Sequence, residues 1–285
     1  MSTGTTTGRG TGRGDGTGDG TGDGAGTVAG AGTTVSGVAR ERRHTLYFLR
    51  AFRAAAPVFL DTEVDMSAVL AHRTASRAAG RKVSVVSYVV HDAARVLARH
   101  PEANAAIRGR YRPKVARYPS VQVRVAFDKV LNGQRIIMAA VLPQAEASDL
   151  RAVQDRIEAV RDGDPATMPE FSGLRLLHRL PWPAGPAAIR VAALPLRRRP
   201  STLGTLAVTS LGHSCVDGLH TMAGTTVTLG LGRILDRPVV RDGAIAVAPV
   251  MRLNLTFDHR VIDGAEAADI LSEIKAALEA FPPAG

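Results

Sequence analysis

The sequence predicts an α/β fold, in which strands and helices alternate along most of the chain. Towards the C-terminus, apolar side chains at every second position indicate a strand with one buried face; they are Met251, Leu253, Leu255 and Phe257. Apolar residues at helical spacing follow directly; they are Ile270, Leu271, Ile274, Ala277 and Leu278. The same succession occurs near the beginning, where residues 57–65 predict a strand and residues 66–79 a helix.

The other elements follow from the same patterns. In chain order we expect a basic helix (40–53), the strand and helix just named, a buried helix (85–97), two strands (121–127 and 135–142) and a helix (148–161). The dipeptide Asn132-Gly133 is typical of a two-residue hairpin turn, so the two strands should pair. Pro101 ends the buried helix, and Ser148 is the expected N-cap of the last one.

Residues 1–39 differ from the rest in composition. They are nearly all Gly, Thr, Ala, Asp and Ser. Such a tract has few side chains to bury and much conformational entropy to lose on ordering. We therefore expect a disordered tail over residues 1–39 and one large domain over residues 40–285.

The chain carries a net charge of +10. This excess is either a solvated surface rich in arginine or a means of attracting an anionic partner. Nucleic-acid binding is not indicated, because aromatic residues make up only 4% of the chain and no recognition motif occurs. No apolar run approaches the roughly 18 residues that a transmembrane segment needs. The single cysteine, Cys215, excludes an intramolecular disulfide and favours a cytoplasmic location.

A histidine follows the C-terminal strand directly. His259 stands three residues before Asp263-Gly264, and the amphipathic helix begins there. Imidazole titrates near neutral pH and can take a proton from a thiol or a hydroxyl. A side chain at the end of a strand is held rigidly, so His259 is a candidate general base.

The string TFDHRVIDGAEAA around His259 resembles the DHRxxDGA signature of the catalytic domain of dihydrolipoamide acyltransferases, the second component of 2-oxoacid dehydrogenase complexes. Residues 56–65 are similar to the family's APHxxxxxEVD strand, with Val58 in place of the common histidine, and residues 100–107 to its HPxxNA segment. The resemblance implies a mixed β-sheet sandwich with helices on one face, as in chloramphenicol acetyltransferase. It also implies a homotrimer, or a multiple of three, with active sites between subunits.

The resemblance also implies roles for single residues. His259 would be the general base. Residues 204–212 are similar to the family's GTFTxSNxG strand, which places the hydroxyl that stabilises the oxyanion on Thr209. Ser210 stands at the asparagine of that motif and is the alternative donor, in contact with substrate.

Asp263 would fix the catalytic loop by pairing with an arginine of the N-terminal basic helix. Arg42, Arg43 and Arg50 are all possible partners. Gly264 would permit a close turn into the helix beside the substrate.

Two segments depart from the family pattern. The hairpin over 130–142 lacks the GLxxPV segment that helps to line the carrier channel, and the stretch 165–200 is longer than usual. That stretch is basic and apolar, so it is either a helical cover on the domain or a surface that binds membranes. We identify neither a lipoyl domain nor a segment that binds peripheral subunits.

A second HxxxDG string occurs at His213–Gly218. No long amphipathic helix follows it, so we interpret the match as coincidence. Cys215, within this string, is expected to be a small packed residue rather than a nucleophile.

Together with the resemblance, these features imply acyl transfer between CoA and a thiol of the dihydrolipoamide type, or alternatively an amine or a hydroxyl, through a ternary complex. The lipoyl group would come from a carrier protein in trans, and neither a metal nor a tightly bound cofactor is expected. The alternative is a non-catalytic scaffold or a regulatory relative, which the altered hairpin over 130–142 and the missing lipoyl domain favour.

Overall fold

A computed structural model describes residues 33, 35–109 and 111–283. The chain divides into two units, Met1–Val38 and Ala39–Gly285, and the helices and strands named below belong to the second. The disorder predicted for residues 1–39 concerns a segment that lies almost wholly outside the described residues.

A six-stranded sheet has the order β1-β8-β7-β6-β4-β5. Its strands are β1 (Pro57–Asp65), β4 (Val123–Leu131), β5 (Gln134–Leu142), β6 (Leu206–Ser210), β7 (Val227–Arg241) and β8 (Ala244–Asp258). The short strand β6 runs parallel to β4 and β7, and the other neighbours are antiparallel. The predicted mixed sheet is therefore confirmed. A separate hairpin joins β2 (Ala105–Arg108) to β3 (Lys114–Arg117).

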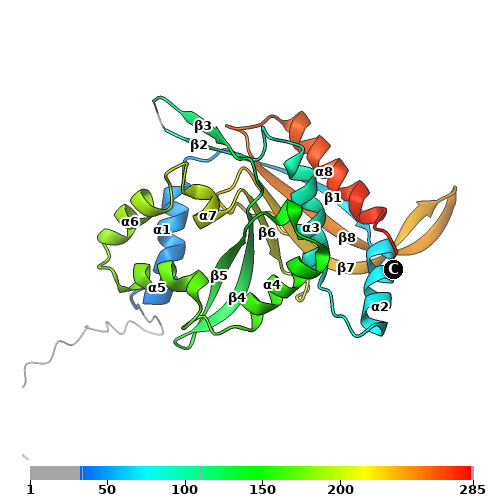
Figure 1. Cartoon of the computed structure of the whole chain (residues 1–285), viewed down its shortest axis with the longest axis horizontal. Helices are drawn as coiled ribbons and strands as arrows, with labels where there is room; N and C mark the ends of the chain where they lie inside the picture. The colour runs from blue at the N-terminus through cyan, green and yellow to red at the C-terminus, as the bar shows by residue number, and fades with distance from the viewer. Residues whose placement is uncertain (1–32, 34, 110, 284–285) are drawn as a thin grey trace, which may run out of the picture. The chain divides into compact units, whose positions relative to one another are not determined.

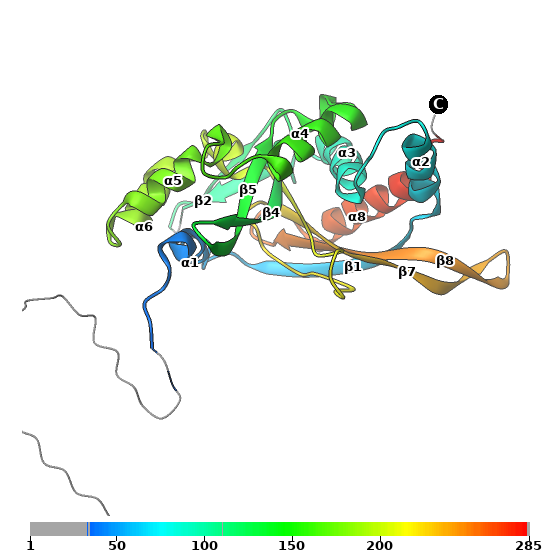
Figure 2. The same ribbon diagram turned by 90° about the horizontal axis from the view of Figure 1, so that it is seen from below.

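Helices cover one face of this sheet, as expected (Figures 1 and 2). They are α2 (Ser67–Ala78), α3 (Val85–Ala98), α4 (Leu150–Asp162) and α8 (Gly264–Glu279). The inward residues of β8, including Leu253 and Leu255, are fully buried in one core with Ile270 and Ile274 of α8. The periodicity that predicted both elements thus reports a single interface between them.

The opposite face, called the open face below, carries less cover. The helix α1 (Arg43–Ala51) lies over β4 and β5, since Arg124 stacks on the Phe48 ring and His44 Nε2 is 3.1 Å from the Ile137 carbonyl oxygen. The segment that follows residue 165 forms α5 (Ser172–Arg179), α6 (Ala184–Ala192) and α7 (Arg199–Leu203). Short 3₁₀ turns complete the fold: Arg40–Arg42, Ala145–Ala147 and Pro169–Phe171.

The segment 165–200 forms a helical cover on the domain, which is one of the two alternatives that the sequence left open. The pair α5 and α6 packs beside α1 (Figure 1). The Tyr47 ring of α1 lies against the Trp182 ring at 5.3 Å between centroids, and Gly185 of α6 approaches Tyr47 so closely that an added Cβ would overlap it.

Local signals are mostly confirmed. Asn132 and Gly133 both have positive φ, which is the conformation that their hairpin turn requires. The N-cap of α4 is Asp149, whose Oδ1 accepts a hydrogen bond from the Ala152 N–H at 2.7 Å. The prediction of Ser148 is therefore wrong by one residue, because α4 begins at Leu150 and the carboxylate reaches its first turn.

Candidate active site

His259 lies where β8 ends. Its backbone N–H donates to the Ala56 carbonyl at 2.9 Å, immediately before β1 begins, and its ring packs against Phe257 with centroids 5.4 Å apart. The side chain is half-exposed, and Nδ1 is 3.5 Å from Asp263 Oδ1. Strand pairing therefore holds the backbone of the histidine while the ring stays open to solvent and to a substrate.

The loop behind His259 is fixed by its neighbours. Asp258 is buried, and its two oxygens accept hydrogen bonds from Arg260 Nε at 2.8 Å and Nη2 at 2.6 Å. Burial alone would raise the pKa of Asp258, but the hydrogen bonds and the charge of Arg260 outweigh it and hold that pKa below its ordinary value. The pair sets the path of the chain on both sides of His259.

Asp263 and Gly264 are placed differently from the expectation. The Asp263 side chain is 91% exposed, and among the described residues its ion-pair partner is His259 rather than Arg42, Arg43 or Arg50. The predicted arginine pair is thus wrong within one chain, where Arg43 lies over the Trp182 ring instead.

Gly264 does not have a positive φ, and a Cβ added to it would meet no atom within 4 Å. The prediction that Gly264 permits a close turn is therefore wrong, because the first turn of α8 would accept a side chain there. Its role in substrate binding stays a prediction.

Thr209 and His259 lie far apart within one chain. Thr209 is opposite Gly230 on β7, and Gly230 is opposite Asn254 on β8, so His259 is five residues further along. With a rise of about 3.3 Å per residue and about 4.8 Å between strands, Thr209 and His259 are separated by roughly 19 Å. A site that uses both residues must therefore combine two copies of the chain.

The hydroxyl groups of Thr209 and Ser210 differ in availability. Ser210 Oγ accepts a hydrogen bond from the Gly212 N–H at 3.2 Å, in the turn that follows β6. Thr209 is partly exposed, and within the described part of the chain its hydroxyl has no hydrogen-bond partner. Thr209 is consequently the freer donor.

A loop over residues 211–226 lies flat on the open face beside Thr209. A Cβ on Gly230 would meet the Leu219 carbonyl oxygen at 1.8 Å, and a Cβ on Gly232 would meet the backbone carbonyl oxygen of Asp217 at 2.0 Å. Asn254 Oδ1 also accepts from the Leu219 N–H at 2.8 Å. Sequence reasoning missed this contact, although glycines two apart in a strand are a signal that another backbone approaches one face.

The second HxxxDG string lies within this loop. Asp217 Oδ1 accepts a hydrogen bond from Arg233 Nε at 2.6 Å, so the carboxylate anchors the loop to β7. His213 is exposed and belongs to no helix or strand. Cys215 is also exposed, so the expectation that it would be packed is wrong.

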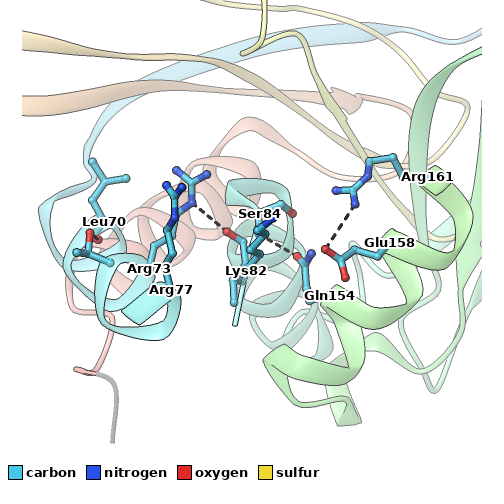
Figure 3. Close-up of a pocket in the computed structure, with 10 residues that line it drawn as sticks. Leu70, Arg73, Arg77, Lys82, Ser84, Gln154, Glu158 and Arg161 are labelled. Carbon is cyan, nitrogen blue, oxygen red and sulfur yellow. Dashed lines mark hydrogen bonds and ion pairs between the residues drawn. The ribbon is translucent and has the colours of Figure 1, made fainter. Parts of the chain in front are cut away.

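A basic pocket of about 360 Å³ opens between α2, the first turn of α3 and α4 (Figure 3). Four cations line it against the single carboxylate of Glu158; they are Arg73, Arg77, Lys82 and Arg161. Ser84 caps the N-terminus of α3 at its edge, and a helix N-terminus favours anions. The pocket is suited to a phosphate-bearing ligand.

A family model described as 2-oxoacid dehydrogenases acyltransferase (catalytic domain) matches residues 34–164 and 195–283. The chain belongs to this family. The unmatched residues, 165–194, include α5 and α6. The expectation that the stretch 165–200 is longer than usual in the family stays a prediction.

Curated relatives are acetyltransferase components of pyruvate dehydrogenase complexes. The chain is 27% identical over 225 residues to that of Bacillus subtilis, which covers 78% of this chain and 44% of the relative. It is 52% identical over 50 residues to the corresponding component of Staphylococcus aureus. This match covers 18% of this chain and 12% of the relative. The chain thus spans less than half the length of these relatives.

Solved structures share the fold. A probable dihydrolipoamide acetyltransferase from Listeria monocytogenes has a TM-score of 0.64 at 19% identity, covering 88% of this chain and 96% of that one. The cubic core of a pyruvate dehydrogenase multienzyme complex has a TM-score of 0.64 at 18% identity, covering 87% and 92%. In the described residues no helix has both the length and the apolar character to cross a membrane, and no three His, Cys, Asp or Glu side chains gather as metal ligands would.

Proposed function

We propose that this chain is an acyltransferase that moves an acyl group between CoA and a thiol of the dihydrolipoamide type. The observation that carries the proposal is His259 at the rigid end of β8, with Nδ1 directed at Asp263 and the ring open to solvent. A carboxylate on Nδ1 favours the tautomer with a proton there, which leaves Nε2 as the acceptor.

The reaction needs only proton transfer and charge stabilisation. His259 Nε2 takes the proton of the attacking thiol, and the thiolate attacks the acyl carbon of the thioester. The hydroxyl of Thr209 from a second copy donates to the oxyanion of the tetrahedral intermediate. When the intermediate collapses, the bond to the departing sulfur breaks and that sulfur takes the proton back from His259. No covalent enzyme intermediate, metal or tightly bound cofactor takes part in this proposal.

The basic pocket is the proposed site for the phosphate groups of CoA. Its cations, among them Arg77 and Lys82, exceed its carboxylates, and the N-terminus of α3 adds partial positive charge. A functional use of the net charge of +10 is thereby supported at one place on the surface. We propose a lipoyl carrier protein in trans as the second partner and a cytoplasmic location.

We also propose a homotrimer or a multiple of three. The distance between Thr209 and His259 requires a second copy, and the cubic core of the pyruvate dehydrogenase complex shares this fold.

The test is an acyl-transfer assay. Purified protein is incubated with acetyl-CoA, or with longer acyl-CoAs, and dihydrolipoamide, and the CoA thiol released is followed. We expect transfer that requires His259, and a raised KM for acyl-CoA in the variant Arg77→Ala with little change in kcat. A folded protein that transfers none of these groups would favour the alternative, a scaffold, which the altered β4–β5 hairpin also supports.

A further inference from the structure

The segment over residues 100–105, which resembles the HPxxNA segment of the family, contacts the candidate active site from outside it. It begins with His100, directly after the C-cap of α3, and α3 packs beside α8 (Figure 1). The His100 side chain is 13% exposed; its Nδ1 is 2.6 Å from Glu266 Oε1, and its Nε2 is 3.0 Å from Glu273 Oε1. Both carboxylates belong to α8, so the ring bridges two turns of one helix.

Each of these contacts requires a proton on its ring nitrogen. An ionised carboxylate only accepts hydrogen bonds, whereas a neutral imidazole has one N–H and an imidazolium has two. The pair of contacts is thus complete only for the imidazolium ring. Arg99 pairs with the other oxygen of Glu273, so Glu273 has two cationic partners. Among the described residues Glu266 has only His100 as an ion-pair partner, so its position depends on that ring.

Glu266 lies in the first turn of α8, where the helix leaves the active-site loop. The N-cap of α8 is Asp263, and the Ala267 N–H donates to the Asp263 carbonyl at 3.2 Å. No side-chain hydrogen bond caps this helix, so the position of Asp263 depends on the backbone of the first turn. The Asp263 carboxylate in turn is 3.5 Å from His259 Nδ1. A contact that fixes Glu266 thereby acts on the orientation of the candidate base.

The other end of the segment supports the opposite side of His259. Asn104 is buried, and its side-chain amide donates to two backbone carbonyls. Next to it, the Ala105 carbonyl accepts a hydrogen bond from Thr226 Oγ1 at 2.5 Å, and the Thr226 carbonyl accepts one from the Asp258 N–H at 3.0 Å. The segment therefore contacts both the strand end before His259 and the helix after it.

We infer that His100 is a positioning residue for acyl transfer. By holding Glu266 it fixes the first turn of α8, and that turn keeps the Asp263 carboxylate beside the candidate base. The inference rests on the proposed function, in which His259 Nε2 accepts the proton of the thiol. Positioning matters because a displacement of about 1 Å at a reacting group can lower a rate by about 10²-fold.

The two carboxylates on His100 provide a matched comparison. Both are partly exposed, at 35% for Glu266 and 40% for Glu273, and the replacement of either removes one ion pair with the ring. Only Glu266 lies in the turn that follows Asp263. Loss of either contact should therefore lower the melting temperature, but only loss of the Glu266 contact should lower kcat.

Steady-state kinetics of acyl transfer test this difference. Glu266→Ala should lower kcat by about tenfold with little change in KM, because the base is displaced while the substrates still bind. Glu266→Gln, whose amide oxygen can still accept from His100 Nδ1, should keep most of the activity. Glu273→Ala should have the kcat of wild type. Equal losses of kcat in Glu266→Ala and Glu273→Ala, or no loss in Glu266→Ala, would overturn the inference.

A second measurement does not depend on activity. Nitrogen-15 NMR of histidine-labelled protein reports the tautomer of the neutral His259 ring, whose signals are identified by their loss in His259→Ala. Wild type should carry the proton on Nδ1, and Glu266→Ala should show a mixture of the two tautomers. An unchanged tautomer in Glu266→Ala would contradict the inference, because Asp263 would then be held without His100. A tautomer that changes as expected in a protein that transfers no acyl group would refute the proposed function alone.

Discussion

At the scale of single residues, the two nitrogens of His259 are inequivalent. Nδ1 is 3.5 Å from Asp263, whereas Nε2 has no partner among the described residues. The exposed carboxylate orients the ring without burying a charge. It therefore contributes little to stability, in contrast to the buried Asp258 that Arg260 holds.

His259→Ala should abolish acyl transfer, with kcat/KM falling by about 10²–10⁴-fold, because a positioned base is lost. His213→Ala should leave most of the activity, since His213 is exposed in the loop after β6. Steady-state kinetics of both variants test this assignment. An inactive His213→Ala together with an active His259→Ala would reverse it.

Thr209→Val should lower kcat by about 10²-fold with little change in KM, because an oxyanion donor acts mainly in the transition state. Valine keeps the shape of threonine and removes only the hydroxyl. Thr209→Ser, which restores a hydroxyl, serves as the control and should remain active. Full activity of Thr209→Val would transfer the role to Ser210 or to a backbone N–H.

The contact between His44 and His178 predicts a loss of stability in acid. Their ring nitrogens are 3.0 Å apart, and His178 is buried. Burial, and then the charge of His44, lower the pKa of His178 to about 4, while burial also lowers the pKa of His44.

The folded state thus binds fewer protons than the unfolded state between about pH 6.5 and pH 4. The neutral His178 therefore contributes fully to the free energy of unfolding above pH 6.5. This contribution, on the order of 3 kcal/mol, is lost as the pH falls towards 4. Denaturant unfolding should show that the free energy of unfolding of wild type is lower at pH 5 than at pH 7.5. This decrease should be smaller for His178→Asn. Equal falls in the two proteins would contradict the assignment to this pair.

At the scale of elements, the helices α5 and α6 depend on close contact with α1. Gly185→Ala should destabilise the protein by about 1–3 kcal/mol, because the new Cβ would lie 2.1 Å from the Tyr47 ring. Gly173→Ala is a matched control: it is also the second residue of its helix, and a Cβ there meets nothing within 4 Å. Thermal melting of both variants decides the matter, and identical melting temperatures would show that α6 can shift at no cost.

At the scale of the whole molecule, the proposed site depends on assembly. His259→Ala and Thr209→Val should each be impaired alone, but a mixture refolded together should regain activity. Mixed assemblies then contain interfaces with an intact Thr209 from one copy and an intact His259 from the other. Assays across mixing ratios should show a maximum near equal amounts. Activity that stays at the weighted mean of the two variants would place both residues in one chain.

Local features of the site could be predicted from the sequence because they depend on neighbours in the chain. The strand that ends on His259, the loop that follows and α8 lie within about thirty residues, so periodicity places all three. The pattern could not show whether Asp258 or Asp263 takes an arginine. That choice depends on which carboxylate is buried beside a cation, and here the buried one is Asp258, beside Arg260.

The sequence by itself determined the α/β class and the position of the candidate base. Only the tertiary structure decided that Thr209 and His259 are held apart, because their separation depends on the register of β6, β7 and β8, which are distant in the chain.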